Sequence, residues 1–560
     1  MTPGFGRIWD DVNVNNLSEK GKNAMIPSPQ KLSECLAVLP AIQSISGNDQ
    51  EVFYSGISFD SRTIKPGDIY VALRGINTDG HQYIKTAIQN GASAVIGEEP
   101  FPDPFTVPYI RVADSREAMG YAAAALYRFP SKELVIIGVT GTDGKTTTST
   151  LIYEILRQQG LKTGLISTVS AVIDEQEIDT GFHVTTPESP DIQKYLAMMK
   201  EAGVTHVICE TTSHGLAQKR VAAIHFDIAV LTNITHEHID YHKTSEAYFA
   251  AKSSLFEMLG KGTQTISPLA ILNYDNPESY NFVRERISVP YISYSASGED
   301  EIPVCSLIKM ETDSHGMRAD VKLKLPGNHE PFQMIRIETS LIGSYNLSNI
   351  LAAVTATVFG LGISPQVAAQ GVHNMKSIPG RMQLIDCGQN FTAIVDFAHT
   401  PNALSVALDS ARELLPAKSQ GRVIAVYGSA GLRDRQKRRM MPAISAEKAD
   451  ITIITAEDPR TESLDAILKE MADEAILYGA RMGETLFTIP DRGDAIRFAL
   501  SLATPDDLVI SCGKGHEQSM CFGEKEYLWD DRTAMRAALC ELLQIPGPEM
   551  PYLPTAKKKN

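Results

Sequence analysis

The sequence is poor in cysteine, and its few cysteines form no pattern typical of a metal site. They are odd in number and far apart, and no two of them make a C-x-x-C pair. Such scattered thiols predict neither a disulfide framework nor structural zinc, and they fit a reducing, cytoplasmic compartment. The cysteines stand at positions 35, 209, 305, 387, 512, 521 and 540.

Long apolar runs and an excess of basic residues are also missing. No stretch approaches the length of a membrane-spanning helix, and no basic start followed by an apolar run suggests a secretory signal. We therefore expect no membrane insertion. The formal net charge of −15 argues against a general nucleic-acid-binding surface, so an anionic ligand would have to meet locally placed cations.

A chain of 560 residues with 43% hydrophobic content is long enough for several packed cores. Alternating apolar runs and helical patterns predict an α/β fold with mostly parallel sheets. We expect a flexible tail over residues 1–30 and three domains: a small one at 31–130, a central one at 131–380 and a C-terminal one at 381–550.

Two local expectations concern segments outside these regular alternations. Residues 31–45 have the apolar spacing of one short amphipathic helix. Residues 291–340 resemble an antiparallel stretch inserted into the central domain.

The central domain begins with a predicted strand, a Gly-rich turn and a predicted helix. The turn and the start of the helix span residues 140–147, and they contain Gly141, Thr142, Asp143, Gly144, Lys145, Thr146 and Thr147. Backbone N–H groups in such a turn bind phosphate, the lysine reaches the outer phosphates, and Thr146 can ligate Mg²⁺. Gly138 lies one residue too early for the usual spacing. The simpler alternative is a tight turn with a solvated lysine, but the two glycines and three threonines favour phosphate binding.

Polar residues follow several predicted strands at the point where each strand ends. Glu210 ends the strand at 204–210, and a run rich in histidine, residues 232–242, follows the strand at 227–231. In the C-terminal domain polar clusters occupy 396–402, 428–439, 456–462 and 513–517. Ligands of open parallel sheets bind beyond the carboxyl ends of strands, so these segments are candidate site residues.

From about residue 50 to residue 545 the chain resembles the Mur ligase family. So many motifs in the same order make a chance match improbable, and they are site residues rather than fold residues. The motifs are residues 140–147, 210–220, 232–242, 343–349, 379–382, 396–404, 428–438 and 513–517, with the isolated Lys252.

The resemblance implies three α/β domains: a UDP-sugar-binding domain, a P-loop-type central ATPase and a Rossmann-like C-terminal domain that binds an amino acid. Among family members the motifs are most similar to those of ligases that add a diamino acid to UDP-N-acetylmuramoyl-L-alanyl-D-glutamate in peptidoglycan synthesis. Such enzymes use ATP to convert a carboxylate into an acyl phosphate, which the incoming amine attacks. The resemblance further implies a cytoplasmic monomer whose domains close before reaction.

The resemblance also implies a metal site. Glu210 and His238 match ligands of a second Mg²⁺, Thr146 matches a ligand of the ATP-linked ion, and Lys145 supplies further positive charge. Lys252 matches a lysine that CO₂ carbamylates, which turns a cation into a carboxylate-like group. Without the family, a structural histidine at 238 and a solvated helical lysine at 252 are the ordinary interpretations.

Other matches imply contacts with the two larger substrates. Asn346, Asn349, Arg381 and Asp396 match residues that bind the nucleotide. For the UDP-sugar peptide the matching residues are Ser61, Thr185, Thr186, Thr212, Gln218 and Arg220.

For the incoming amino acid the matching residues are Arg433, Asp458, Arg460, Gly513 and Glu517. Members that use diaminopimelate usually show Asp-Asn-Pro-Arg where this chain has Glu457-Asp458-Pro459-Arg460. Arg460 suits a distal carboxylate and favours meso-diaminopimelate, because a bidentate arginine–carboxylate pair is specific. The acid at 458 instead suits the distal ammonium of lysine or ornithine, so those amino acids stay open.

The sequence leaves two alternative functions to consider, and it contains one basic segment that could be mistaken for a nucleic-acid site. Another ligase of the superfamily, such as folylpolyglutamate synthetase, fits the Thr212, Gln218 and Arg220 pattern less well. A non-catalytic nucleotide-binding subunit would not need the complete set of Lys145, Glu210, His238 and Lys252. The basic run at 433–439 predicts a solvated helix face with one functional arginine rather than a nucleic-acid site.

Overall fold

A computed structural model describes residues 27–556 of the chain, with short internal gaps. The gaps are residues 48, 50, 76–77, 101–105, 169–170, 174–175, 179–185, 236–238, 263–264, 299–300, 314–315, 328–331, 376 and 417–418. The chain forms two compact units. The first unit comprises Met1–Pro130, Glu188–Met198 and Lys219–Ile224, and the second comprises Ser131–Pro187, Met199–Gln218 and His225–Asn560.

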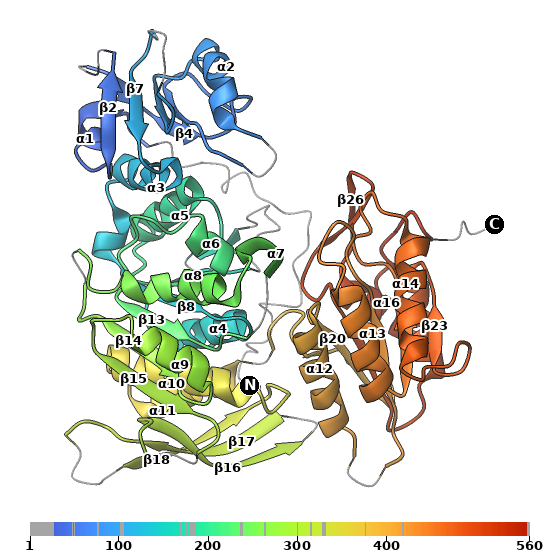
Figure 1. The fold of residues 1–560 in the computed structure, drawn as a ribbon. Helices are drawn as coiled ribbons and strands as arrows, with labels where there is room; N and C mark the ends of the chain where they lie inside the picture. The colour runs from blue at the N-terminus through green and yellow to red at the C-terminus, as the bar shows by residue number, and fades with distance from the viewer. Residues whose placement is uncertain are drawn as a thin grey trace. The chain divides into compact units, whose positions relative to one another are not determined.

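The first unit is built on a five-stranded sheet in the order β2-β7-β6-β5-β4. Strands β4 to β7 pair in parallel, and β2 runs antiparallel to β7. Apolar residues of α1 and α3 pack on one face of the sheet, and those of α2 pack on the other (Figure 1). The elements are α1 (Leu32–Leu36), β2 (Ile42–Ser46), β4 (Gly56–Ser58), β5 (Asp68–Val71), α2 (Ile84–Gln89), β6 (Ala94–Gly97), β7 (Tyr109–Val112) and α3 (Ser115–Leu126).

The amino-terminal part of the first unit differs from both expectations for it. The single helix predicted over 31–45 is wrong: α1 ends at Leu36, and β2 occupies Ile42–Ser46. The sheet edge offered by β7 supplies partners for this backbone, and those tertiary hydrogen bonds override a weak helical pattern. Most of the predicted tail lies outside the described residues, but Gln30 is buried in β1 (Gln30–Lys31), which pairs with β3 (Phe53–Tyr54).

The second unit contains an eleven-stranded sheet in the order β11-β10-β9-β12-β8-β13-β14-β15-β16-β17-β18. Its middle, from β9 to β16, is parallel, and both ends are antiparallel. The strands are β8 (Val135–Thr140), β9 (Thr163–Ile166), β10 (Ala171–Ile173), β11 (Gln176–Ile178), β12 (His206–Glu210), β13 (Ile228–Leu231), β14 (Leu269–Asn273), β15 (Tyr291–Ser295), β16 (Cys305–Asp313), β17 (Gly316–Leu323) and β18 (Gln333–Thr339). The antiparallel stretch predicted from residue 291 therefore begins later, since β15 still pairs in parallel with β14.

Helices cover this sheet because its central strands are apolar on both faces. One buried cluster joins α4, α10 and α11 to β8, β12 and β13. It continues over the three antiparallel strands β16, β17 and β18. On the opposite face a Cβ at Gly138 would lie 2.9 Å from Leu255 of α8 and from Phe226, so a larger residue would displace these side chains. The helices are α4 (Lys145–Gln158), α6 (Ser213–Ala217), α7 (Ile239–His242), α8 (Ser245–Glu257), α9 (Pro277–Arg284), α10 (Asn346–Leu361) and α11 (Pro365–Asn374). Helix α5 (Ser189–Glu201) is divided between the two units, because Glu188–Met198 belongs to the first.

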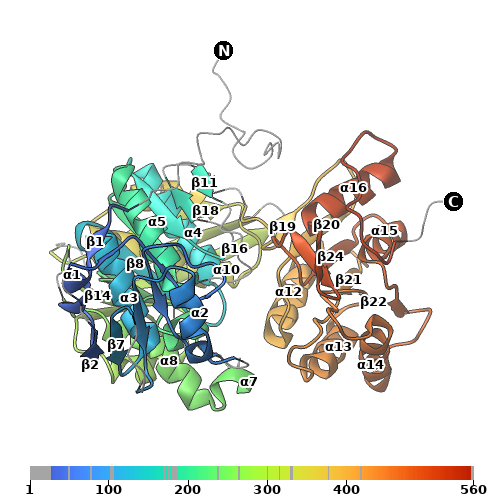
Figure 2. The ribbon, with the colours of Figure 1, turned by 90° about the horizontal axis from the view of Figure 1, so that it is seen from above.

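A six-stranded sheet in the order β19-β20-β24-β21-β22-β23 organises the C-terminal part of the second unit. Helices α12, α13 and α14 pack on one face of it, and α15 and α16 pack on the other (Figure 2). The strands are β19 (Gln383–Leu384), β20 (Thr392–Asp396), β21 (Val423–Tyr427), β22 (Ile451–Ile454), β23 (Leu486–Thr488) and β24 (Leu508–Cys512). The helices are α12 (Pro401–Glu413), α13 (Lys437–Lys448), α14 (Leu464–Leu477), α15 (Arg492–Leu502) and α16 (Asp531–Leu543), and a hairpin pairs β25 (Ser519–Phe522) with β26 (Lys525–Leu528).

The strands predicted at 204–210 and 227–231 are confirmed as β12 and β13, within two residues at each end. Parallel pairing brings the carboxyl ends of β8 and β12 to one edge of the large sheet, and those of β20, β21, β22 and β24 to one edge of the smaller sheet. Every described helix is too short or too polar to traverse a lipid bilayer.

Candidate active site

The Gly-rich turn between β8 and α4 has the form of a phosphate-binding loop. Its lysine, Lys145, is the first residue of α4 and donates from Nζ to the carbonyl oxygens of Gly141 (3.0 Å) and Thr142 (2.7 Å). Asn233 accepts from Thr142 N (2.8 Å) and, through Oδ1, from Asp143 N (3.0 Å). Asn233 and Lys145 thus both form hydrogen bonds with the backbone of the turn.

Gly144 lies beside Asn349 of α10, which in turn bonds to Asn346. Gly144 has φ +79°, which favours glycine, and a Cβ there would overlap Oδ1 of Asn349. Asn349 Nδ2 donates to Asn346 Oδ1 (3.0 Å), and Asn346 Nδ2 donates to the Ile342 carbonyl (2.7 Å). The structure therefore brings both predicted nucleotide-binding asparagines beside the loop, where Thr147 is also buried.

Glu210 ends β12 beside the start of α4, and it is almost completely buried. Thr146 Oγ1 lies 3.0 Å from its Oε1 and 3.1 Å from its Oε2. Thr168 donates to the same carboxylate from Oγ1 (2.9 Å) and from its backbone N (3.2 Å). These donors are neutral, so a carboxylate and a hydroxyl meet at the phosphate loop as a set of oxygens suited to a divalent cation.

Lys252 of α8 reaches the phosphate loop from the other side. Its side chain is 2% exposed, its Nζ donates to the Gly141 carbonyl (2.5 Å), and it lies 4.8 Å from the centroid of the Tyr248 ring. A solvated helical lysine is therefore excluded. His238 lies outside the described residues, and among those that are described no three His, Cys, Asp or Glu side chains cluster as metal ligands.

Asp396 and Arg381 lie together at the edge of the C-terminal sheet. Asp396 accepts from the backbone N of Met382 (2.7 Å) and of Ala398 (2.8 Å), and burial raises the pKa of its carboxyl group. The Arg381 guanidinium stacks over Phe397, with its central carbon 4.4 Å from the ring centroid. The residue after the strand thus supports the arginine.

Two predicted peptide-binding threonines of the second unit touch each other. The hydroxyl groups of Thr186 and Thr212 are 3.1 Å apart, and Thr212 caps the start of α6 by accepting from Gly215 N (3.0 Å). Gln218, at the end of α6, donates from Nε2 to the hydroxyl group of Tyr241 (3.1 Å). Thr185 lies outside the described residues.

Ser61 and Arg220 belong to the first unit. Ser61 is buried, and its carbonyl accepts from Asn90 (2.8 Å). The Arg220 guanidinium forms an ion pair with Glu188 (2.9 Å), and both side chains are mostly buried. Arg220 was expected to meet an anion, and in this structure it meets a carboxylate of the protein.

The segments after β22 and β24 bring four acidic or basic side chains into a small space. Lys514 Nζ contacts both oxygens of Asp458 (3.1 and 3.0 Å) and also Oε2 of Glu517 (2.5 Å). Glu457 is buried, its Oε2 has no hydrogen-bond partner among the described residues, and burial raises its pKa to about 7. Gly513 is required beside it, because a Cβ there would overlap the Glu457 carboxylate.

Arg460 and Arg433 have different surroundings. The backbone of Arg460 bonds to the β25–β26 hairpin through Cys521 O (3.1 Å) and Gly523 N (2.8 Å). Its Nε is buried and has no hydrogen-bond partner in the part of the chain that the structure describes. Arg433 is exposed. The expectation that the rest of the basic run is a solvated face is wrong for Arg438, which is buried and pairs with Glu462 (2.9 Å) and Glu470 (3.3 Å).

A buried ion pair that the sequence patterns did not reveal supports the amino-acid segments. Arg492 and Asp531 are fully buried and make two contacts, from Nε (2.7 Å) and from Nη2 (2.6 Å). Arg492 also donates to the carbonyls of Ala456 (3.2 Å) and Cys512 (2.7 Å). These two residues directly precede Glu457 and Gly513. No sequence motif marks this arginine, because its role arises only when α15 and α16 pack together.

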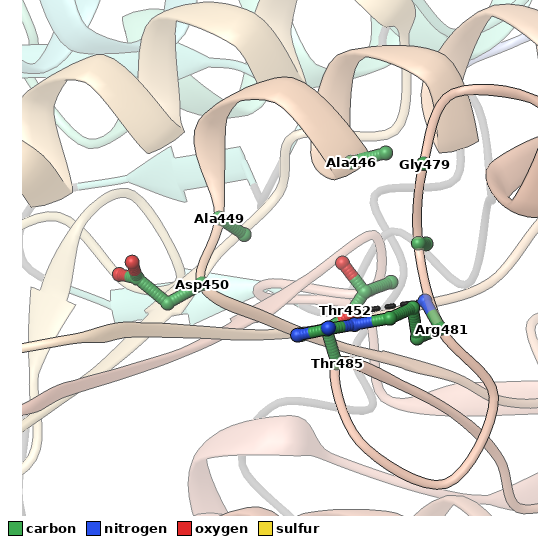
Figure 3. Close-up of a pocket in the computed structure, with 8 residues that line it drawn as sticks. Ala446, Ala449, Asp450, Thr452, Gly479, Arg481 and Thr485 are labelled. Atoms are coloured by element: carbon green, nitrogen blue, oxygen red, sulfur yellow. Dashed lines mark hydrogen bonds between the residues drawn. The ribbon is translucent and has the colours of Figure 1, made fainter.

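A hollow of about 280 Å³ lies at the other end of the C-terminal sheet (Figure 3). Asp450, which lines it, precedes β22, whereas Glu457 follows that strand, so this hollow is separate from the predicted site residues. Within it Arg481 N donates to Thr485 Oγ1 (2.9 Å). The lining residues are Ala446, Ala449, Asp450, Thr452, Gly479, Ala480, Arg481 and Thr485.

Comparison with known proteins identifies the family. Residues 53–127 match the Mur ligase family catalytic domain, residues 139–357 match the Mur ligase middle domain, and residues 380–515 match the Mur ligase glutamate ligase domain. A UDP-N-acetylmuramyl-tripeptide synthetase from Roseiflexus sp. (strain RS-1) is 39% identical over 498 residues, which is 87% of this chain and 95% of that protein. The chain belongs to the Mur ligase family.

Other relatives of this Mur ligase have more specific names. A UDP-N-acetylmuramoyl-L-alanyl-D-glutamate--2,6-diaminopimelate ligase from Geobacillus kaustophilus (strain HTA426) is 37% identical over 512 residues, covering 91% of this chain and 99% of that one. A solved structure of a ligase with the same name has a TM-score of 0.62 and 27% identity, and the match covers 92% of this chain and all of that one.

The predicted three-domain Mur ligase architecture is confirmed by the three domain matches and by this structural similarity. The MurF ligase from Thermotoga maritima, solved in complex with ADP, shares the fold with a TM-score of 0.56 at 17% identity. The domain boundaries at residues 130 and 380 stay a prediction.

Proposed function

We propose that this Mur ligase uses ATP to join a diamino acid, meso-diaminopimelate in preference, to UDP-N-acetylmuramoyl-L-alanyl-D-glutamate in peptidoglycan precursor synthesis. The observation that carries the proposal is 37% identity, over nearly the whole chain, to a protein named as the diaminopimelate ligase. The described site segments support it, because they follow the carboxyl ends of strands in both sheets of the second unit.

The chemistry follows from the weakness of a carboxylate as an acyl donor. Transfer of the ATP γ-phosphoryl group to the substrate carboxylate gives an acyl phosphate, the amine of the diamino acid attacks the carbonyl carbon, and phosphate leaves. The phosphoryl transfer gathers negative charge, which Lys145 offsets. Its ammonium group now bonds to two loop carbonyls, and phosphate oxygens of ATP would replace them as acceptors.

The oxygens at the phosphate loop fit Mg²⁺. Thr146 and Glu210 would hold it, together with His238 as the family resemblance implies, and when bound it supplies charge stabilisation for phosphoryl transfer. Glu210 fits this role because its carboxylate is buried and receives hydrogen bonds only from neutral donors in the described part of the chain.

Carbamylation of Lys252 is part of the same proposal. The lysine is buried beside the loop, where a carbamate would replace a cation with an anion able to support the metal ions. Enzyme prepared with ¹³C-bicarbonate should show a carbamate carbon signal that is absent from the Lys252→Ala variant. An identical spectrum from both proteins would exclude the carbamate.

The remaining parts of the proposal concern substrate contacts and setting. Asn346, Asn349, Arg381 and Asp396 would contact the nucleotide. Ser61, Thr185, Thr186, Thr212, Gln218 and Arg220 would contact the UDP-sugar peptide. Arg433, Arg460, Gly513 and Glu517 would contact the amino acid, with Asp458 beside them in its ion pair with Lys514. We place the enzyme in the cytoplasm as a monomer, with domains at 31–130, 131–380 and 381–550.

Product mass analysis tests the proposal directly. Purified enzyme receives ATP, magnesium, the UDP-dipeptide and an equimolar mixture of meso-diaminopimelate, lysine and ornithine. We expect ADP, phosphate and a UDP-tripeptide carrying diaminopimelate. A lysine or ornithine product would keep the ligase and overturn the amino acid, whereas ATP hydrolysis without any peptide product would favour a non-catalytic nucleotide-binding subunit.

A further inference from the structure

The acid at position 458 is already occupied by the protein. Both oxygens of Asp458 lie within 3.1 Å of Lys514 Nζ, and Oδ1 also accepts from the backbone N of Cys521 (2.9 Å). A carboxylate with these partners offers little to a substrate ammonium, because binding one would first require breaking an ion pair.

Lys514 is placed to balance more than one acid. It is 2% exposed, and it bridges Asp458 to Glu517 with contacts of 3.0 and 2.5 Å. Burial alone would lower the pKa of its ammonium group, but Glu517 and Asp458 raise that pKa above its ordinary value. The lysine is therefore charged, and its removal would leave three carboxylates close together, those of Glu457, Asp458 and Glu517.

Arg460 remains available while Asp458 is engaged. Its backbone is tied to the β25–β26 hairpin, and its φ of +54° shows that the fold holds it in the left-handed region. Its Nε is buried, and no described residue accepts a hydrogen bond from it, which leaves capacity for an anionic ligand. A distal substrate carboxylate would satisfy that capacity.

We propose that Lys514 is a positioning residue that neutralises Asp458, so that Arg460 can select a diamino acid carrying a distal carboxylate. The inference rests on the proposed function and assigns Lys514 a role in its specificity. It also resolves the opposing signals of the segment 457–460: the acid at 458 belongs to an internal ion pair, and the arginine at 460 is the recognition group.

The test compares amino-acid preference between variants, as the ratio of kcat/KM for meso-diaminopimelate to kcat/KM for lysine. Lys514→Met unmasks the Asp458 carboxylate, which attracts a distal ammonium and repels a distal carboxylate, so the ratio should fall by about tenfold or more. In an Asp458→Asn background the same change should have a much smaller effect, because the unmasked charge is gone.

Conservative and matched variants separate this role from a merely structural one. Lys514→Arg keeps the charge and should retain the wild-type ratio, and Lys469→Met, at an exposed lysine of α14, should also leave it unchanged. If Lys514→Met does not fold, as judged by circular dichroism, Lys514→Gln provides the neutral side chain instead.

The outcomes distinguish the inference from the proposed function. An unchanged ratio in the neutral Lys514 variant, or an equal change with Asn at 458, overturns the role of Lys514 while the ligase activity stands. Absence of any UDP-tripeptide from the wild-type enzyme, with every diamino acid, overturns the proposed function itself.

Discussion

Glu457 is a carboxylate that the fold holds almost entirely out of water. No residue within the described ranges donates to its oxygen Oε2, and burial raises the pKa of the group from 4.5 to about 7. Burial of an acid favours its neutral form, so the folded state binds this proton more tightly than the unfolded chain does.

The contribution of Glu457 to the stability of the protein should therefore decrease as the pH rises. With the raised pKa, its favourable contribution is complete below about pH 4.5 and is lost as the pH rises through about 7. Glu457→Gln removes this loss, so chemical denaturation should show the variant gaining on the wild type by at most about 3 kcal/mol between these limits. The Glu462→Gln variant is the control, because Arg438 lowers the pKa of Glu462 and the gap should change in the opposite sense. A gap for Glu457→Gln that does not vary with pH would contradict this account.

Lys145 gives the second residue-scale prediction. Lys145→Met removes the charge that faces the phosphates and should lower ligation by roughly a thousandfold. Lys162→Met, at a lysine beyond the far end of α4, should keep full activity. Phosphate release measured with the UDP-dipeptide and diaminopimelate checks both. Near-normal activity of the Lys145 variant would mean that the turn is not a phosphate site.

For individual residues, the sequence predicted the candidate site residues better than the side chains that contact them. Lys145, Glu210 and Lys252 were identifiable from motifs, and Thr146 does lie on the Glu210 carboxylate. The ion pair of Lys514 with Asp458 was not foreseen, because the two residues are far apart in the chain and a motif gives no distances. That ion pair engages the acid that left lysine and ornithine open as substrates.

Helices α15 and α16 provide the clearest case at the level of elements. They are joined by two arginine–carboxylate pairs: Arg492–Asp531, which is fully buried, and Arg497–Glu541, which is partly exposed. The first also anchors the strand ends that precede Glu457 and Gly513. The two pairs have the same chemistry but different solvation, so they can be compared directly.

Breaking the buried pair should cost far more than breaking the exposed one. Asp531→Ala leaves the Arg492 guanidinium buried without its counter-ion and should lower the free energy of unfolding by about 3–5 kcal/mol. Glu541→Ala should cost less than about 1 kcal/mol, because solvent screens that pair. Urea denaturation of both variants measures the difference. Equal losses would show that Arg492 does not depend on Asp531.

Elements with strong apolar runs were predictable, and weakly patterned ones were not. The strands predicted at 204–210 and 227–231 were placed to within two residues because each is a buried run of β-branched and aliphatic side chains. Residues 31–45 became a helix and a strand because pairing with β7 outweighs helix propensity. The exact start of the antiparallel region was also missed, because an apolar pattern does not show whether a strand pairs in parallel or antiparallel.

For the whole molecule, the division into two units predicts which residues nucleotide binding protects from hydrogen exchange. The phosphate loop, Glu210 and Lys252 all belong to the second unit, while the sheet from β2 to β7 belongs to the first. Hydrogen exchange with a non-hydrolysable ATP analogue and magnesium should slow in residues 141–158 and stay unchanged in β5 and β6. The Lys145→Met variant is the control and should show little slowing at the same concentration. Equal protection in both units would contradict the prediction.

The overall architecture could be predicted from the sequence because the different motifs of one family follow each other, in the family's order, along nearly the whole chain. Packing of helices on both faces of parallel sheets follows from apolar strands and needs no homologue. The surroundings of Arg438, Arg492 and Lys514 could not be predicted, because each depends on side chains brought together only by tertiary packing.

Arg492 ties down two carbonyls that stand immediately before the two segments proposed to meet the amino acid. Ancestral changes in those segments could therefore accumulate while their starting points stayed fixed. A lineage could exchange one diamino acid for another through a few substitutions after residues 456 and 512, with no redesign of the sheet beneath. Cell walls of differing chemistry could in this way arise from a single inherited scaffold.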